Sequence, residues 1–132
     1  MKKIISIILM MSLLYIGKEA HAYNDYSGYT NDQIANAIFQ AEGGYKAKYL
    51  YGIVSIKYKD EADARRICLN TIRNNRIRFK NQDKYDDYIE FLGSRYCPIN
   101  AENDPKGLNK NWVGNVKKIL KQNGGRNDTN KI

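Results

Sequence analysis

Residues 31–55 read NDQIANAIFQAEGGYKAKYLYGIVS, and the expected fold is built around this stretch. Thr30, just before it, and Gln33 form the capping-box pattern that begins a helix. The apolar residues that follow recur at helical spacing and give the helix one apolar face: Ile34, Ala35, Ile38 and Ala41. Glu42 comes directly after that face, and Gly43-Gly44 then let the backbone turn sharply. We therefore expect a helix that ends at a single carboxylate.

Glu42 is the leading candidate for a catalytic group. Acidic residues are disfavoured in the last turn of a helix, where the helix dipole is negative, so its position runs against an electrostatic preference. Packing beside the apolar face would partly remove the carboxyl group from water and raise its pKa toward the range useful to a general acid. The alternative is a solvated glutamate at a helix end, which is the commoner case.

The first 22 residues have the pattern of a secretory signal peptide. Lys2-Lys3 form a basic start, residues 4–16 are an apolar run, and Ala20-His21-Ala22 is an A-x-A cleavage site. Because the apolar run is too short for a stable bilayer anchor, we expect a periplasmic or secreted protein that begins near Tyr23 and has no membrane anchor after cleavage. An uncleaved signal anchor is the alternative. Residues 23–132 are expected to form a single monomeric domain.

The single histidine of the chain, His21, lies within the predicted signal peptide. A mature protein without histidine has no Ser-His or Cys-His nucleophilic site and no zinc site with a histidine ligand. We accordingly expect neither metal nor cofactor. What remains is carboxylate chemistry, or a protein without catalytic activity.

The sequence is basic, with 22 lysines and arginines against 14 acidic residues and a formal net charge of +8. Signal cleavage would lower this charge to +6, because three lysines and one glutamate leave. A basic exported domain suits an anionic target such as cell-wall polymer, an acidic membrane surface or extracellular nucleic acid. Arginines and lysines of residues 65–80 are expected to form a basic surface, but no recognisable nucleic-acid-binding motif accompanies them, so we expect no nucleic-acid partner.

Cys68 and Cys97 are the two cysteines of the chain. In an oxidising compartment, an even pair in a domain this small favours a disulfide. Such a bond would contribute on the order of 3–4 kcal/mol by closing a loop of about 30 residues. Two free buried thiols are the alternative.

Three further helices are predicted after residue 59. The first begins at Asp60 and covers residues 60–75, the second covers residues 83–96, and the third follows an irregular loop at residues 99–111. Residues 45–59 suit a short hairpin or extended segment, with a loop as the alternative, and the tail at residues 122–132 is expected to be flexible. The inward faces of these helices are predicted to carry Ala64, Ile67, Cys68, Thr71 and Ile72; Tyr85, Tyr88, Ile89, Leu92 and Tyr96; and Trp112, Val113, Val116, Ile119 and Leu120.

The order and spacing of several motifs resemble those of small exported lysozyme-like proteins, most closely the lytic transglycosylase-like group of the lysozyme superfamily. The motifs are E-G-G at residues 42–44, Y-G-I at 51–53, R-Y-C-P at 95–98, N-D-P-K-G-L-N at 103–109 and N-W at 111–112. The likeness covers about Asn31 to Leu120, and Glu42 and Gly52 match the glutamate and the following glycine of that superfamily. Common soluble transglycosylases have Glu-Ser and then Gly-Leu-Met-Gln, so Ser55 here replaces a substrate-contacting glutamine.

The resemblance implies a mainly α, lysozyme-like helical domain that cleaves the β-1,4 bond between N-acetylmuramic acid and N-acetylglucosamine in peptidoglycan glycan strands. Glu42 would act as general acid and then as general base. Candidate substrate-binding residues are Tyr45, Tyr51, Gly52, Ser55, Tyr96, Asn103 and Asp104. Tyr96 and Trp112 also suit a core, and Asn103 and Asp104 a turn or helix cap.

Two alternatives stay open. If the reaction is hydrolysis, a second carboxylate is needed, with Asp60, Glu61, Asp63 and Asp104 as candidates. The protein could also be a non-catalytic, basic cell-wall-binding protein on the same scaffold.

Overall fold

The computed structural model describes residues 26 and 28–127. The predicted signal peptide, residues 1–22, lies outside the described residues, as do residues 128–132. Four α-helices make up most of the described chain: α2 (Asn31–Ala41), α3 (Glu61–Lys80), α4 (Tyr88–Tyr96) and α5 (Trp112–Asn127). Short 3₁₀ turns lie between them: η1 (Gly44–Lys46), η2 (Leu50–Gly52) and η3 (Leu108–Asn111). The predicted mainly helical class is confirmed.

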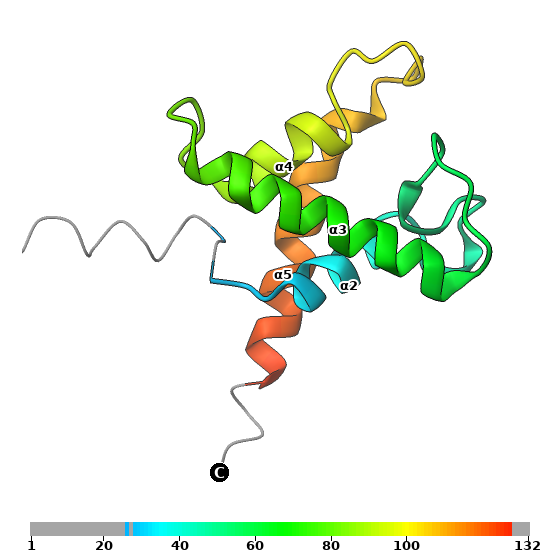
Figure 1. Cartoon of the computed structure of the whole chain (residues 1–132), viewed down its shortest axis with the longest axis horizontal. Coiled ribbons are helices and arrows are strands. Elements are labelled where there is room, and N and C mark those ends of the chain that lie inside the picture. Colours follow the sequence, from blue (N-terminus) through cyan, green and yellow to red (C-terminus); the bar gives the residue numbers. More distant parts are fainter. Residues whose placement is uncertain (1–25, 27, 128–132) are drawn as a thin grey trace, which may run out of the picture.

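Helices α2 and α4 each pack on both α3 and α5, whereas α3 and α5 make no close backbone approach within the described chain. Figure 1 shows the long helix α3 crossing α5, with α2 on one side of α3 and α4 on the other. The two shorter helices therefore fill the space between the two longer ones. Their meeting faces form one apolar core, with these residues fully buried: Ile34, Ala35, Ile38, Ala64, Cys68, Ile72, Ile89, Leu92 and Val116.

The local signals at the first helix act as the sequence predicts. The Thr30 side chain accepts a hydrogen bond from the Gln33 backbone N–H at 3.1 Å, and the Gln33 side chain accepts one from the Thr30 N–H at 2.8 Å. These two bonds satisfy backbone donors that the helix itself leaves unpaired. Asp60 caps α3 in a similar way, its carboxylate accepting from the Asp63 N–H at 2.8 Å.

Four features differ from the predictions. Helix α3 ends at Lys80 instead of residue 75. The hairpin after the first helix is wrong: residues 45–59 hold η1, the turn η2 and irregular chain, and no strand occurs among the described residues. Helix α4 begins at Tyr88 instead of residue 83, because Gln82 accepts the backbone N–H groups of Lys84 and Tyr85 and Asp87 supplies the helix cap. Helix α5 continues to Asn127, past the predicted start of the tail at residue 122.

The predicted disulfide is wrong, because Cys68 and Cys97 are both free thiols. Cys68 is buried in the core on α3, and the Tyr96 hydroxyl of α4 lies 3.9 Å from the Cys68 Sγ. Tyr96 therefore faces Cys68, and Cys97, the next residue, is the C-cap of α4. Burial raises the pKa of Cys68 to about 12 and that of Cys97 to about 11, so both stay protonated at neutral pH.

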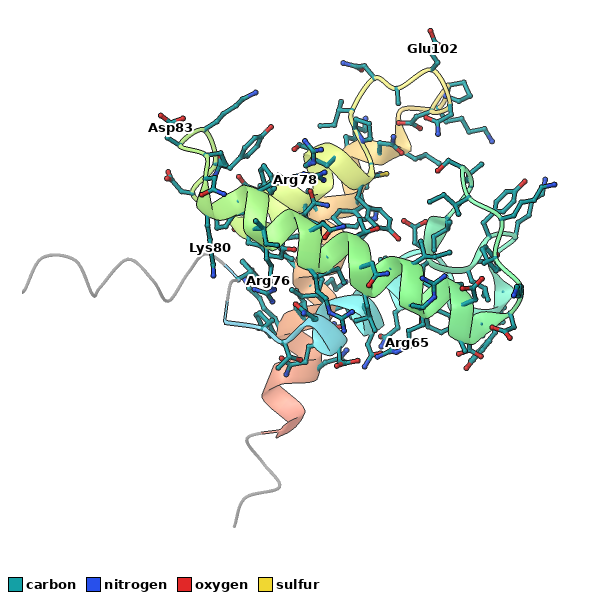
Figure 2. The ribbon with its side chains drawn as sticks, viewed as in Figure 1. Arg65, Arg76, Arg78, Lys80, Asp83 and Glu102 are labelled. Atoms are coloured by element: carbon teal, nitrogen blue, oxygen red, sulfur yellow. The ribbon has the colours of Figure 1, made fainter. Side chains whose placement is uncertain are left out.

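The expected outward basic surface is only partly present. Arg65 and Arg76 are half-buried and turn toward α2, and Figure 2 shows both on the side of α3 opposite the Arg78 label. Arg65 donates to Asp32 at 2.7 Å and to Asn36 at 2.8 Å, and Arg76 donates to Asn31 at 2.6 Å. These two arginines therefore join α3 to α2 instead of presenting charge to a partner. Within the described chain, no helix has the length and apolar character that crossing a bilayer requires.

Candidate functional site

Glu42 lies at the C-cap of α2, where the backbone leaves the helix. Its N–H donates to the Ile38 carbonyl at 2.9 Å, so it still belongs to the last turn. Gly43 follows with φ of 103°, a conformation that residues with a side chain rarely adopt. The double glycine therefore ends the helix at once and leaves the Glu42 side chain at its very end.

Gly52 covers the Glu42 carboxyl group. Its φ is 68°, and a Cβ atom at this position would lie 2.7 Å from Cδ and 2.8–2.9 Å from the two carboxylate oxygens of Glu42. Both the backbone conformation and the lack of space thus require glycine here. The superfamily resemblance pairs Glu42 with Gly52, and the structure places the two residues in direct contact.

Tyr51, just before Gly52, adopts the left-handed conformation with φ of 55°. Such a conformation costs on the order of 1 kcal/mol in a residue with a side chain and persists only when the surroundings enforce it. Here the Tyr51 ring is buried against Phe39, its hydroxyl accepts from Arg65 at 3.3 Å, and its carbonyl accepts from the Tyr96 hydroxyl. These contacts hold the turn that presses Gly52 onto Glu42.

Trp112 also contacts the Glu42 carboxyl group. The indole N–H donates to the Glu42 Oε1 at 2.8 Å, and the ring is only 6% exposed. It stacks on Tyr96, with ring centroids 5.3 Å apart and an interplanar angle of 24°. Gly93 of α4 makes room for this arrangement, since a Cβ there would lie 2.6 Å from the Val113 Cγ2 and 3.2 Å from the indole ring.

The pKa of Glu42 is raised above its ordinary value. Burial is the larger cause, because it disfavours the charged carboxylate, and the Trp112 hydrogen bond opposes it by stabilising that charge. Glu42 makes no ion pair with any described residue. A carboxyl group in this setting holds its proton to higher pH than an ordinary glutamate, as a general acid must.

Glu42 lies in a groove with a cavity volume of about 300 Å³, at the low end of the range for ligand sites. One wall comes from the segment after α2, with Lys48, Tyr49, Gly52 and Val54, and the other from the end of α4 and the loop that follows it. Figure 1 shows these two segments at the same end of the molecule. Glu42 is the sole carboxylate among the residues that line the groove.

The structure brings together four of the residues predicted for the site: Glu42, Gly52, Tyr96 and Asn103 all line the groove. Tyr96 makes two contacts at the site: its hydroxyl donates to the Tyr51 carbonyl, and its ring stacks on Trp112. The alternatives of core residue and groove residue therefore both apply to Tyr96.

The other four predicted residues lie outside the groove lining. Tyr45 is 75% exposed and its hydroxyl donates to Glu61 at 2.9 Å. Tyr51 is a core residue, and Ser55 is exposed on the chain before α3. Asp104 lies in the turn before η3, and its carboxylate accepts from the backbone N–H groups of Leu108 at 2.8 Å and Asn109 at 2.9 Å, as the turn alternative predicts.

None of the four candidate second carboxylates lines the groove with Glu42. Asp60 caps α3, Glu61 accepts from Tyr45, and Asp104 holds η3. The Arg66 guanidinium, at 2.6 Å, lowers the pKa of Asp63. Each therefore has a local role in the described structure, and Glu42 has no carboxylate opposite it.

Sequence reasoning missed several residues of the site. Trp112 is predicted as a core residue, although its indole N–H contacts the candidate acid, and Gly93 is not among the predicted site residues. The missed lining residues are Ala47, Lys48, Tyr49, Val54, Cys97, Pro98 and Asn109. One signal could have indicated Trp112: it is the single tryptophan of the chain, and a buried indole N–H needs an acceptor.

Comparison of the chain with protein-family models, curated proteins and solved structures gives no match in any of the three. In the described part of the chain, no group of three or more His, Cys, Asp or Glu side chains could hold a metal ion.

Proposed function

We propose that the protein is a peptidoglycan-cleaving enzyme of the lysozyme-like, lytic transglycosylase type, exported from the cell and acting as a monomer on glycan strands. The observation that carries this proposal is the pairing of one protonatable carboxyl group, Glu42, with an open groove that has no second carboxylate. Gly52 and Trp112 both contact that group. The helical fold and the motif resemblance support the same assignment.

The single-acid route fits this geometry better than hydrolysis. Most glycosidases place two carboxyl groups across the scissile bond, about 5–10 Å apart. In the route proposed here, Glu42 first gives its proton to the leaving glycosidic oxygen of the β-1,4 bond between N-acetylmuramic acid and N-acetylglucosamine. The resulting carboxylate then takes the proton of the C6 hydroxyl, which attacks C1 and forms a 1,6-anhydro ring. The carboxyl group regains its proton, so one residue serves both steps.

The hydrogen bond to Trp112 gives the two Glu42 oxygens different tasks. The Glu42 Oε1 accepts a hydrogen bond from the Trp112 indole N–H at 2.8 Å. A carboxyl oxygen that carries the acid proton would point that proton at the indole N–H, so Oε1 is the unprotonated oxygen. The proton is therefore held on Oε2. In the second step, the same indole bond stabilises the carboxylate that forms.

Mass spectrometry of soluble products tests the proposal. Purified protein from residue 23 onward and its Glu42→Gln variant are each incubated with peptidoglycan. Fragments ending in 1,6-anhydro-muramic acid from the wild type, with at least a hundredfold less from the variant, are expected for loss of a general acid. Reducing-end products would refute the single-acid route, and equal product from the variant would refute the role of Glu42.

A non-catalytic wall-binding protein is the second candidate. It is favoured by the basic charge, +8 for the full chain and +6 after the predicted signal cleavage. It is also favoured by the lining of the groove, which includes Lys48 and exposed Tyr49 and a single acid, Glu42. This candidate predicts binding to peptidoglycan that weakens with added salt, because the contacts are ionic, and no product at any protein concentration.

A further inference from the structure

A second cavity, larger than the groove, lies between α2 and the end of α5. Its volume is about 430 Å³, and it shares no lining residue with the Glu42 groove. Gln33, Asn36 and Gln40 form one stripe of its α2 wall, and Asn123 faces them from α5. At 100° per residue, Glu42 lies about 150° around the α2 axis from that stripe. The cavity is thus a separate site on the other side of the helix.

The lining of this cavity carries no charge among the described residues. It consists of four amide side chains, the rings of Tyr29 and Phe39, Leu120 and Gly124. The nearby Arg65 is already paired with Asp32 at 2.7 Å. An ionic ligand would lose water here without gaining a counter-charge, which is unfavourable. The chemistry suits an uncharged, polar ligand with an apolar face.

Two of the amides are oriented by bonds outside the cavity. The Asn36 Oδ1 accepts from Arg65 at 2.8 Å, and the Gln33 Oε1 accepts from the Thr30 N–H at 2.8 Å. Each bond fixes the orientation of its amide, and neither NH₂ group donates to a described residue, so both NH₂ groups are available to donate to a ligand. Gln40 and Asn123 make no side-chain hydrogen bond to any described residue, so both remain available. The cavity therefore presents donors to a ligand rich in oxygen acceptors.

We propose that this cavity is a second carbohydrate-binding site, which holds an uncharged N-acetylated sugar without cleaving it. Hydroxyl and acetamido oxygens match the NH₂ donors, and the apolar face of a sugar ring matches Tyr29 and Phe39. None of the described residues that line the cavity carries a carboxyl group, so this lining offers no acid for bond cleavage. The choice of a glycan sugar rests on the proposed function. Bound there, a glycan segment would keep the protein on the polymer while the groove acts on another segment.

Nuclear magnetic resonance tests this site directly, because side-chain NH₂ groups give their own signals. The Glu42→Gln protein from residue 23 onward is titrated with the trisaccharide of N-acetylglucosamine. The NH₂ signals of Gln33, Asn36, Gln40 and Asn123 are expected to shift and to saturate. The double variant Gln40→Ala/Asn123→Ala, which loses two hydrogen-bonding groups, should weaken this response about tenfold. Asn115→Ala, an exposed amide of the same helix α5, is the matched control and should leave it unchanged.

Each other outcome overturns the site. Shifts confined to the Gly52 N–H and the Trp112 indole N–H would show that sugar binds the groove alone, and would leave the proposed function standing. Equal shifts of the four amides with inorganic phosphate would refute an uncharged ligand. No shift at any signal would also refute the second site, while the products released from peptidoglycan decide the proposed function separately.

Discussion

Replacing Trp112 with phenylalanine removes one hydrogen bond from Glu42 and keeps an aromatic ring at that position. The indole N–H to Oε1 contact of 2.8 Å disappears, whereas a ring stacked on Tyr96 remains possible. A hydrogen bond to a charged group contributes about 1.5–3 kcal/mol. The site is open on its groove side, so the low end of that range applies, and about 1.4 kcal/mol corresponds to one pKa unit. Because the bond favours the ionised carboxylate, its loss should raise the Glu42 pKa by about one unit.

The pH profile of kcat/KM measures this shift. A general acid must be protonated in the free enzyme, so activity falls as pH rises through the Glu42 pKa. The high-pH limb of Trp112→Phe is therefore expected about one unit above that of the wild type. Cys97 and Tyr96 do not obscure the limb, because burial raises the pKa of Cys97 to about 11 and raises that of Tyr96 far above its ordinary value.

Tyr96→Phe is the matched control, since it removes the hydroxyl bonded to the Tyr51 carbonyl and leaves the indole bond in place. The high-pH limb of the kcat/KM profile of Tyr96→Phe should stay within a few tenths of a pH unit of the wild-type limb. A limb that does not move in Trp112→Phe, or moves to lower pH, would refute the reasoning that the indole stabilises the ionised form. Thermal unfolding of both variants shows whether the fold is kept.

Three other perturbations follow from the same contacts. Gly52→Ala should lower the activity at least tenfold and the free energy of unfolding in urea by on the order of 1–3 kcal/mol, because it adds backbone strain and a Cβ 2.7 Å from the Glu42 Cδ. Gly107→Ala is the control. Gly107 has φ of 63° and open space around it, so this substitution adds strain alone and should leave the activity unchanged. Gly93→Ala should destabilise the fold by about 1–3 kcal/mol, because the added Cβ overlaps with Val113. Gly114→Ala, on the open side of α5, should be neutral or slightly stabilising. Equal unfolding midpoints for the two variants would contradict the predicted overlap. Glu42→Gln should raise Tm relative to the wild type at pH 7 but not at pH 4. The reason is that a carboxyl group with a raised pKa in the folded state loses its stabilising contribution as pH rises through that pKa. The same Tm difference at pH 4 and pH 7 would show that burial of the charge is not the cause.

The helices could be predicted from the sequence because capping residues and apolar spacing are local signals. Thr30 and Gln33 specify the start of α2 within four residues, and the apolar spacing of Ile34, Ala35 and Ile38 specifies its buried face. The start of α4 was misplaced because Gln82 captures the N–H groups of Lys84 and Tyr85, which would otherwise enter a helix. That choice depends on one side-chain rotamer and has no signature in apolar spacing.

Only part of the candidate site could be predicted from the sequence, because its residues come together through tertiary contacts. Glu42 and Gly52 lie in two neighbouring motifs, E-G-G and Y-G-I, which the resemblance pairs. The bond from Trp112 spans 70 positions and depends on Gly93, whose missing Cβ admits the indole. The disulfide prediction failed for a related reason: spacing allowed Cys68 and Cys97 to meet, but the direction of Tyr96 in the last turn of α4 decides which side chain faces Cys68.

A glutamate kept for stability would be surrounded differently from Glu42. A structural carboxylate normally has a cationic partner or several backbone donors, and its folded pKa then falls, so that its charge stabilises the fold at neutral pH. Glu42 has a single side-chain donor, Trp112, and burial outweighs that bond. Its ionisation therefore works against folding, and the strained turn at Tyr51 that presses Gly52 onto it adds a further cost. The first cost falls on the Glu42 carboxyl group and the second on the turn that covers it, which is the pattern that the proposed role of Glu42 as an acid predicts.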